Sequence, residues 1–223
     1  MKRNINLFAL LLSFMIITSC KKDDFTYPEG QVGVSKITYY IDLSPKGDQL
    51  IIINKGDAYT DAGANSIAGG KDAPYTSSGT VNAATPGVYI INYSATNTDG
   101  FPSSSYRTVV VMDPAAGAKD LSGSFARSTN GAVSVWTKLS PGIYTVVNPG
   151  GFPGVTWSVT VVNYSGNNIA IPQQESAVGT FASANGVATP GVVPPDVVSP
   201  MISYSWNVIN GGYGTQSRIF NKI

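Results

Sequence analysis

Side chains able to perform covalent or acid–base chemistry are few in this chain of 223 residues. Cys20 is the single cysteine and histidine is absent, so the commonest general base and the commonest metal ligand are both missing. Beyond residue 120 the acidic side chains are Glu175 and Asp196, each in a proline-flanked segment that predicts a loop. A glycosidase needs two carboxyl groups roughly 5 to 9.5 Å apart. The sequence therefore favours a non-enzymatic protein without metal or cofactor, and a carboxylate-dependent hydrolase is the least favoured alternative.

The segment that ends at Cys20 has the layout of an export signal. Lys2 and Arg3 form a basic start, and an apolar run over 7–17 is too short to span a bilayer. The sequence ITSC at 17–20 resembles the lipobox of bacterial lipoproteins, with Ile17 in place of the usual leucine. The resemblance implies that residues 1–19 are a signal peptide and that Cys20 carries lipid, palmitate included. The alternatives are a buried structural cysteine and an ordinary secretory signal.

The residues after the cysteine predict the cellular location of the protein. The charged sequence KKDD at 21–24 resembles the short signal that sends lipoproteins to the outer face of some Gram-negative outer membranes. This implies an outer-membrane protein, lipid-anchored and facing the cell exterior. A solvated tether or a periplasm-facing anchor is the alternative, because short motifs often occur by chance.

Composition predicts an all-β protein of two domains. Charged residues make up 12% and the net charge is +1, so nucleic acid is not an expected partner. The 24 glycines and 14 prolines break the chain into short segments, and no helical period persists past residue 25. We expect a tether over 20–32, a first domain over 33–113, a small-residue linker over 114–119 and a second domain over 120–223.

Four motifs characterise the first domain: GDAYTDAGA at 56–64, GTV at 79–81, PGVYIINYSATNTDG at 86–100 and RTVVV at 107–111. Together they resemble a bacterial immunoglobulin-like (Ig-like) module of the kind found in surface lipoproteins, adhesins and insecticidal crystal toxins. The resemblance implies an Ig-like β-sandwich. Alternation also predicts a strand over 36–43 with Ile37, Tyr39, Ile41 and Leu43 buried. A calcium site on Asp57, Asp61 and Asp99 is conceivable, but capping of turns is the favoured role.

The second domain is predicted to be an antiparallel β-meander, either a small barrel or an open sandwich. Strands are expected over 122–127, 132–139, 143–147, 156–164, 168–171, 180–184, 202–208 and 217–220. The segment 186–200 contains four prolines and predicts an irregular loop or an edge. The motifs DLSGSFARS at 120–128, PGIY at 141–144 and IAIP at 169–172 are similar to C-terminal domains of accessory lipoproteins in starch-utilisation-like glycan uptake systems. This resemblance implies polysaccharide and outer-membrane transporter components as partners.

Aromatic side chains are the candidates for binding a sugar, because pyranose rings stack on flat π-surfaces. Trp157 and Trp206 alternate with apolar residues and are predicted to be core. Trp136 shares its strand face with Ser134 and Lys138, which predicts exposure and makes it the main candidate ligand contact. Phe152 and Tyr213 lie among glycines in predicted loops, where they would either contribute to binding or cover the end of a barrel. A purely structural or adhesive surface protein without a small ligand remains the alternative.

Overall fold

The computed structural model describes residues 26, 28, 31–32, 35–191 and 200–223. Cys20, the predicted signal peptide and Asp196 lie outside the described residues. Two compact units divide the chain, Met1–Tyr39 and Tyr40–Ile223. In the first unit, β1 (Gln31–Val32) and β2 (Ser35–Lys36) pair antiparallel. In the second, an Ig-like module and a β-barrel follow one another along the chain, which confirms the all-β prediction.

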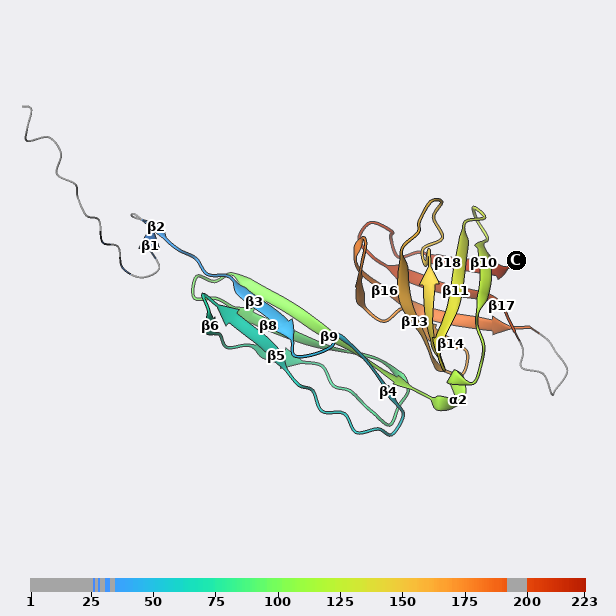
Figure 1. Ribbon diagram of the computed structural model, residues 1–223, viewed down its shortest axis with the longest axis horizontal. Coiled ribbons are helices and arrows are strands. Elements are labelled where there is room, and N and C mark those ends of the chain that lie inside the picture. The colour runs from blue at the N-terminus through green and yellow to red at the C-terminus, as the bar shows by residue number, and fades with distance from the viewer. Residues whose placement is uncertain (1–25, 27, 29–30, 33–34, 192–199) are drawn as a thin grey trace, which may run out of the picture. The chain divides into compact units, whose positions relative to one another are not determined.

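Two small sheets form the Ig-like module (Figure 1). One contains β3 (Ile41–Pro45), β5 (Ala64–Ala68) and β6 (Lys71–Asp72). The other contains β4 (Leu50–Asn54), β9 (Pro102–Met112), β8 (Gly87–Thr96) and β7 (Thr76–Ser78), in that order. β4 runs parallel to β9, whereas the other neighbouring strands of both sheets are antiparallel. The side chains between the sheets include Ile41, Leu43, Ile91, Tyr93 and Val109.

The first predicted strand is correct only in its second half. Ile41 and Leu43 are buried as expected, but Ile37 is 36% exposed and Tyr39 is 48% exposed. The reason lies in the neighbouring strand, which ends at Ala68, the residue opposite Ile41. The pairing of β3 with β5 begins only at Ile41, and alternation alone does not bury the residues that precede it.

A short helix, α2 (Pro114–Gly117), lies in the predicted linker. Asp113 caps it by accepting a hydrogen bond from Ala115 N at 3.0 Å, and proline occupies its first position. Ala116 is 2% exposed, and its carbonyl accepts a hydrogen bond from Asn163 Nδ2. None of the described residues forms a helix that is both long and apolar enough to cross a membrane.

The second domain is a closed antiparallel barrel of eight strands (Figure 1). Around the barrel run β14 (Asn168–Ala170), β13 (Ser158–Ser165), β12 (Ile143–Val147), β11 (Val133–Ser140), β10 (Gly123–Arg127), β18 (Ser217–Lys222), β17 (Met201–Ile209) and β16 (Gly179–Pro190). Pairing of β14 with β16 closes the barrel, and the short strand β15 (Gln174–Ser176) also pairs antiparallel with β16. The barrel is thus the correct alternative, and the open sandwich is wrong.

Closure of the barrel depends on residues 186–190, which the proline pattern predicts to be part of a loop or an edge. β16 continues through Gly186 to Pro190, so the first part of the predicted loop is strand. Gly186 pairs with Ile169 across the seam, and a Cβ at Gly186 would lie 2.1 Å from the Ile169 carbonyl oxygen. Only glycine permits this approach. Residues 192–199 lie outside the described part.

Aromatic rings fill the interior of the barrel. Trp206, Tyr204, Tyr144, Phe125 and Phe220 are at most 1% exposed, and neighbouring rings meet mainly edge to face, with centroids 4.6 to 6.4 Å apart. Such pairs add to the free energy gained by burial alone. The interior is therefore a packed core.

Candidate functional site

Trp136, the main candidate from the sequence, is part of this core. It is 2% exposed and stacks on Trp206. Its expected exposure is wrong because the face of β11 was assigned in reverse: Val133 is 42% exposed and Leu139 is 61% exposed, and both point outward. Trp136 therefore offers no open ring face to a ligand.

Phe152 and Tyr213 come together at one end of the barrel. Their ring centroids lie 4.6 Å apart, and the rings are nearly perpendicular. Trp157 lies beside Tyr213 with a centroid distance of 6.0 Å. All three side chains are half-buried, unlike the fully buried rings of the interior. They come from two loops, over 148–157 and 210–216, that the chain places side by side.

Asparagine side chains hold these two loops in shape. Asn148 adopts a φ of 55°, which asparagine tolerates better than most residues. Its Nδ2 donates to the carbonyls of Val133 and Phe152, and its Oδ1 accepts from Phe152 N at 2.9 Å. In the second loop, Asn210 Oδ1 accepts a hydrogen bond from Gly212 N. These hydrogen bonds shape the backbone that carries both rings.

Two arginines lie directly beneath the aromatic rings. Arg127 is the last residue of β10 and Arg218 lies near the start of β18, and each shares the inward face of its strand with a buried phenylalanine, Phe125 or Phe220. The guanidinium carbons lie 5.3 Å (Arg127) and 4.7 Å (Arg218) from the centroid of the Phe152 ring, within the range of cation–π attraction. We call this group of Arg127, Arg218, Phe152, Tyr213 and Trp157 the arginine end of the barrel.

Backbone carbonyls accept the hydrogen bonds of both guanidinium groups. Arg218 donates to the carbonyls of Gly150 and Tyr213, and Arg127 donates to the Gly151 carbonyl at 3.2 Å. Burial, together with the charge of Arg127, lowers the pKa of Arg218 to about 10. Arg218 is therefore charged at neutral pH, although its side chain is only 3% exposed. Sequence analysis missed both arginines, and the available signal was their alternation with Phe125 and Phe220.

The opposite end of the barrel, next to α2, has a cavity of about 530 Å³. Its lining is mainly apolar and includes Leu121, Ala188 and Met201. The ammonium group of Lys119 is already engaged, since it donates to the Gly166 carbonyl at 2.9 Å and to Asn167 Oδ1 at 2.6 Å. This cavity has the volume of a small-molecule site but few polar groups that would orient a ligand.

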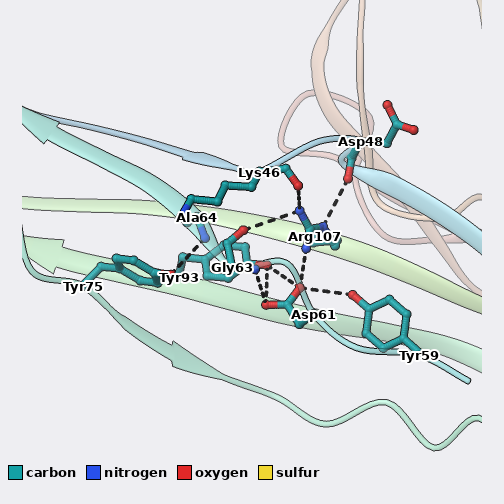
Figure 2. A network of polar contacts seen from close by, with 9 residues as sticks. All are labelled: Lys46, Asp48, Tyr59, Asp61, Gly63, Ala64, Tyr75, Tyr93 and Arg107. Carbon is teal, nitrogen blue, oxygen red and sulfur yellow. Dashed lines mark hydrogen bonds and ion pairs between the residues drawn. The ribbon is translucent and has the colours of Figure 1, made fainter. Parts of the chain in front are cut away.

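Asp61 is part of a polar network inside the Ig-like module (Figure 2). Asp61 forms an ion pair with Arg107, which is 1% exposed, and accepts hydrogen bonds from Tyr93 and Tyr59. Arg107 also donates to the carbonyls of Lys46 and Asp48. The network joins Tyr93 and Arg107 of one sheet to the loops that follow β3 and precede β5 of the other sheet, so its role is to hold the module together.

The Asp61 carboxylate is stabilised in its charged form. Burial raises the pKa of Asp61, but hydrogen bonds from Tyr93, Arg107 and Tyr59 outweigh burial and hold the pKa below its ordinary value. Asp57 instead accepts a hydrogen bond from Asn54 N within a turn. In the described ranges, no three His, Cys, Asp or Glu side chains gather as a metal site would require.

Glu175 is likewise engaged with neighbouring hydroxyls. Its Oε1 accepts hydrogen bonds from Tyr106 at 3.0 Å and from Thr180 Oγ1 at 2.8 Å. The other acidic side chain considered for hydrolysis, Asp196, lies outside the described residues.

Comparison with known proteins identifies the first module. Residues 43–111 match the family model of the bacterial surface protein Ig-like domain, which confirms the predicted Ig-like module. The crystal structure of the lipoprotein BT2262 from Bacteroides thetaiotaomicron is similar at 22% sequence identity, with a TM-score of 0.34. The match covers 82% of this chain and 100% of BT2262. No curated protein matches the sequence. The chain thus contains a domain typical of bacterial surface proteins.

Proposed function

We propose that the protein is a non-enzymatic surface lipoprotein that binds glycan at the arginine end of its barrel. Lipid on Cys20 anchors it to the outer membrane, facing the cell exterior. The Ig-like module acts as a spacer, and the barrel carries the binding site. Components of a polysaccharide uptake system, including an outer-membrane transporter, are its partners.

The observation that carries this proposal is the group of half-buried rings at the arginine end. Phe152, Tyr213 and Trp157 combine aromatic surface with neighbouring hydrogen-bond donors, which is the composition that sugar recognition needs. The rings inside the barrel are fully packed against one another and contribute no binding surface. The two loops present Phe152 and Tyr213 in contact with each other at this end of the barrel.

An adhesive protein without a small ligand is the second candidate, and the outer surface of the barrel favours it. Val133, Val135 and Leu139 on β11 are 38 to 61% exposed, and Ile219 on β18 is 50% exposed. An apolar outer surface of this kind suits contact with another protein. In this alternative the rings at the arginine end serve only to cover the barrel.

Affinity electrophoresis through a panel of polysaccharides separates the two candidates. The full chain is kept soluble in a polyoxyethylene ether detergent, because glycosidic detergents would compete for a sugar site. Glycan binding predicts retarded migration in at least one gel that contains polysaccharide. Unretarded migration throughout a broad panel of neutral and acidic polysaccharides would contradict it and favour the adhesive alternative.

A further inference from the structure

The two arginines at the arginine end have no acidic partner. Arg107 pairs with Asp61, but among the described residues no carboxylate contacts Arg127 or Arg218, whose acceptors are the carbonyls of Gly150, Gly151 and Tyr213. Arg218 has very little access to water and lies next to a second cation, so its charge is costly to bury. Carbonyl dipoles offset this cost only in part, because they carry no net charge.

The two arginines at the arginine end also have hydrogen-bond donors without acceptors. The Nε atoms of Arg127 and Arg218 are both buried and have no hydrogen-bond partner among the described residues. Buried donors without acceptors are rare in folded proteins, and each calls for an explanation. A pair of them, on two guanidinium groups that face the same phenylalanine ring, shows that both groups have donors that no acceptor among the described residues uses.

The glycine loop lies directly on the guanidinium groups. A Cβ at Gly150 would lie 2.9 Å from Arg218 Nη1, and a Cβ at Gly151 would lie 2.7 Å from Arg127 Cδ. A side chain at either position would have to displace the neighbouring arginine side chain. The carbonyl oxygens of Gly150 and Gly151 accept hydrogen bonds from guanidinium nitrogens that an oxyanion would also use.

We infer that Arg127 and Arg218 form a binding site for a carboxylate or sulfate group of an acidic glycan. A guanidinium group donates two parallel hydrogen bonds to such an oxyanion, and charge-assisted bonds are stronger than neutral ones. The anion supplies the missing negative charge, and the rings of Phe152 and Tyr213 contact the sugar that carries it. This inference rests on the proposed function and specifies its ligand class.

The site must loosen to admit the anion, since Arg218 is almost inaccessible in the closed form. The glycines at 150, 151 and 154 give the covering loop the freedom to shift. Arg127, which is half-buried, is the first of the two charges that an approaching anion meets. The oxyanion then takes the place of the Gly151 carbonyl as the acceptor for Arg127. The loop loses one hydrogen bond, and Arg127 forms a stronger, charge-assisted one with the anion.

Matched polymers test the charge preference. Polygalacturonate is compared with its methyl-esterified form, and dextran sulfate with dextran, by isothermal titration of the full chain in polyoxyethylene ether detergent. We expect at least one acidic polymer to bind about tenfold or more tightly than its neutral counterpart, and added salt to reduce the difference. The first pair tests carboxylate and the second tests sulfate. Equal binding of acidic and neutral forms would overturn the inference while leaving glycan binding intact.

Variants of Arg127 show whether the site is the one inferred. Arg127→Gln should abolish the preference for the acidic polymer, Arg127→Lys should retain part of it, and Lys222→Gln, which removes an exposed charge from the same barrel, should leave it unchanged. A preference that survives in Arg127→Gln would overturn the assignment. Circular dichroism of each variant verifies the fold.

A measurement without sugar tests the anion site on its own. Sulfate, compared with chloride at equal ionic strength, should raise the thermal midpoint of the wild type more than that of Arg127→Gln. Equal shifts would reflect only the general stabilising effect of sulfate and would count against the site. A larger shift in the wild type, combined with no glycan binding, would support the anion site and contradict the glycan function.

Discussion

Trp136 stacks on Trp206 inside the barrel, with ring centroids 5.6 Å apart and 21° between the ring planes. The two tryptophans come from β11 and β17, which are not neighbours in the sheet. Their contact therefore connects two non-adjacent strands across the interior of the barrel. Ligand binding must accordingly take place at an end of the barrel or on its outer surface.

Replacing Trp136 with alanine should destabilise the barrel strongly. Removal of a buried tryptophan leaves a cavity and costs about 3 to 5 kcal/mol, so urea unfolding followed by circular dichroism should show a much lower midpoint. Leu139→Ala, on the exposed face of the same strand, is the control and should change the midpoint little. An unchanged midpoint for Trp136→Ala would show that the ring is not part of the core.

A substitution at Gly186, where β14 pairs with β16, should also destabilise the barrel. Gly186→Ala places a methyl group against the Ile169 carbonyl, so β14 and β16 must separate, and we expect a loss of about 2 kcal/mol or more. Gly211→Ala adds the same methyl group where nothing lies within 4 Å and should be tolerated. Amide hydrogen exchange at β14 reports the effect directly, and unaltered protection there in Gly186→Ala would contradict the closed seam.

Local patterns in the sequence predicted individual strands well. The strand over 143–147 is found with the expected bounds, and Gly100, with a φ of 88°, forms the expected turn between β8 and β9. Both features depend on residues close together in the chain. Alternation and turn chemistry are sufficient for such features.

Features that depend on the closed barrel could not be predicted in the same way. On β11 the apolar Val133 and Leu139 face outward, whereas Trp136 shares the inward face with Ser134, so the apolar pattern favours the wrong face as the buried one. Arg127 and Arg218 are far apart in sequence and meet only because β10 pairs with β18. Phe152 and Tyr213 were found from their glycine-rich surroundings, but their contact depends on the arrangement of two separate loops.

The ion pair of Asp61 and Arg107 should dominate the stability of the Ig-like module. Asp61→Asn leaves Arg107 buried without its counter-charge, which should cost about 3 kcal/mol. Asp42→Asn changes an exposed carboxylate on β3 and is the matched control. Urea unfolding monitored by circular dichroism would contradict this account if the two variants were equally stable.

The same pair predicts a dependence on pH with a definite sign. The pKa of Asp61 is lower in the folded state than the ordinary value for an aspartate, so the unfolded chain binds a proton more readily. The stabilisation is complete above the unfolded pKa and is lost as the pH falls through the folded pKa. Wild type should therefore lose its advantage over Asp61→Asn in acid, and a constant difference between them would contradict this prediction.

Lipidation is expected to depend on Cys20. Cells supplied with labelled palmitate should incorporate label into the wild type and none into Cys20→Ala, which should also leave the membrane fraction or remain unprocessed. Ser19→Ala, which keeps a small residue before the cysteine, should still be labelled. A wild-type chain that takes up no label would contradict the proposed anchor.

Titration of a bound oligosaccharide against Tyr213→Ala tests glycan recognition at the arginine end most directly. The ligand is cut from whichever polysaccharide retards the wild type, and Phe101→Ala, which removes a 45% exposed ring from the Ig-like module, is the control. An aromatic contact contributes about 1 to 3 kcal/mol, so Tyr213→Ala should raise the dissociation constant about tenfold or more, while Phe101→Ala leaves it unchanged. Equal affinity of wild type and Tyr213→Ala, with both folded, would contradict the placement of the binding site.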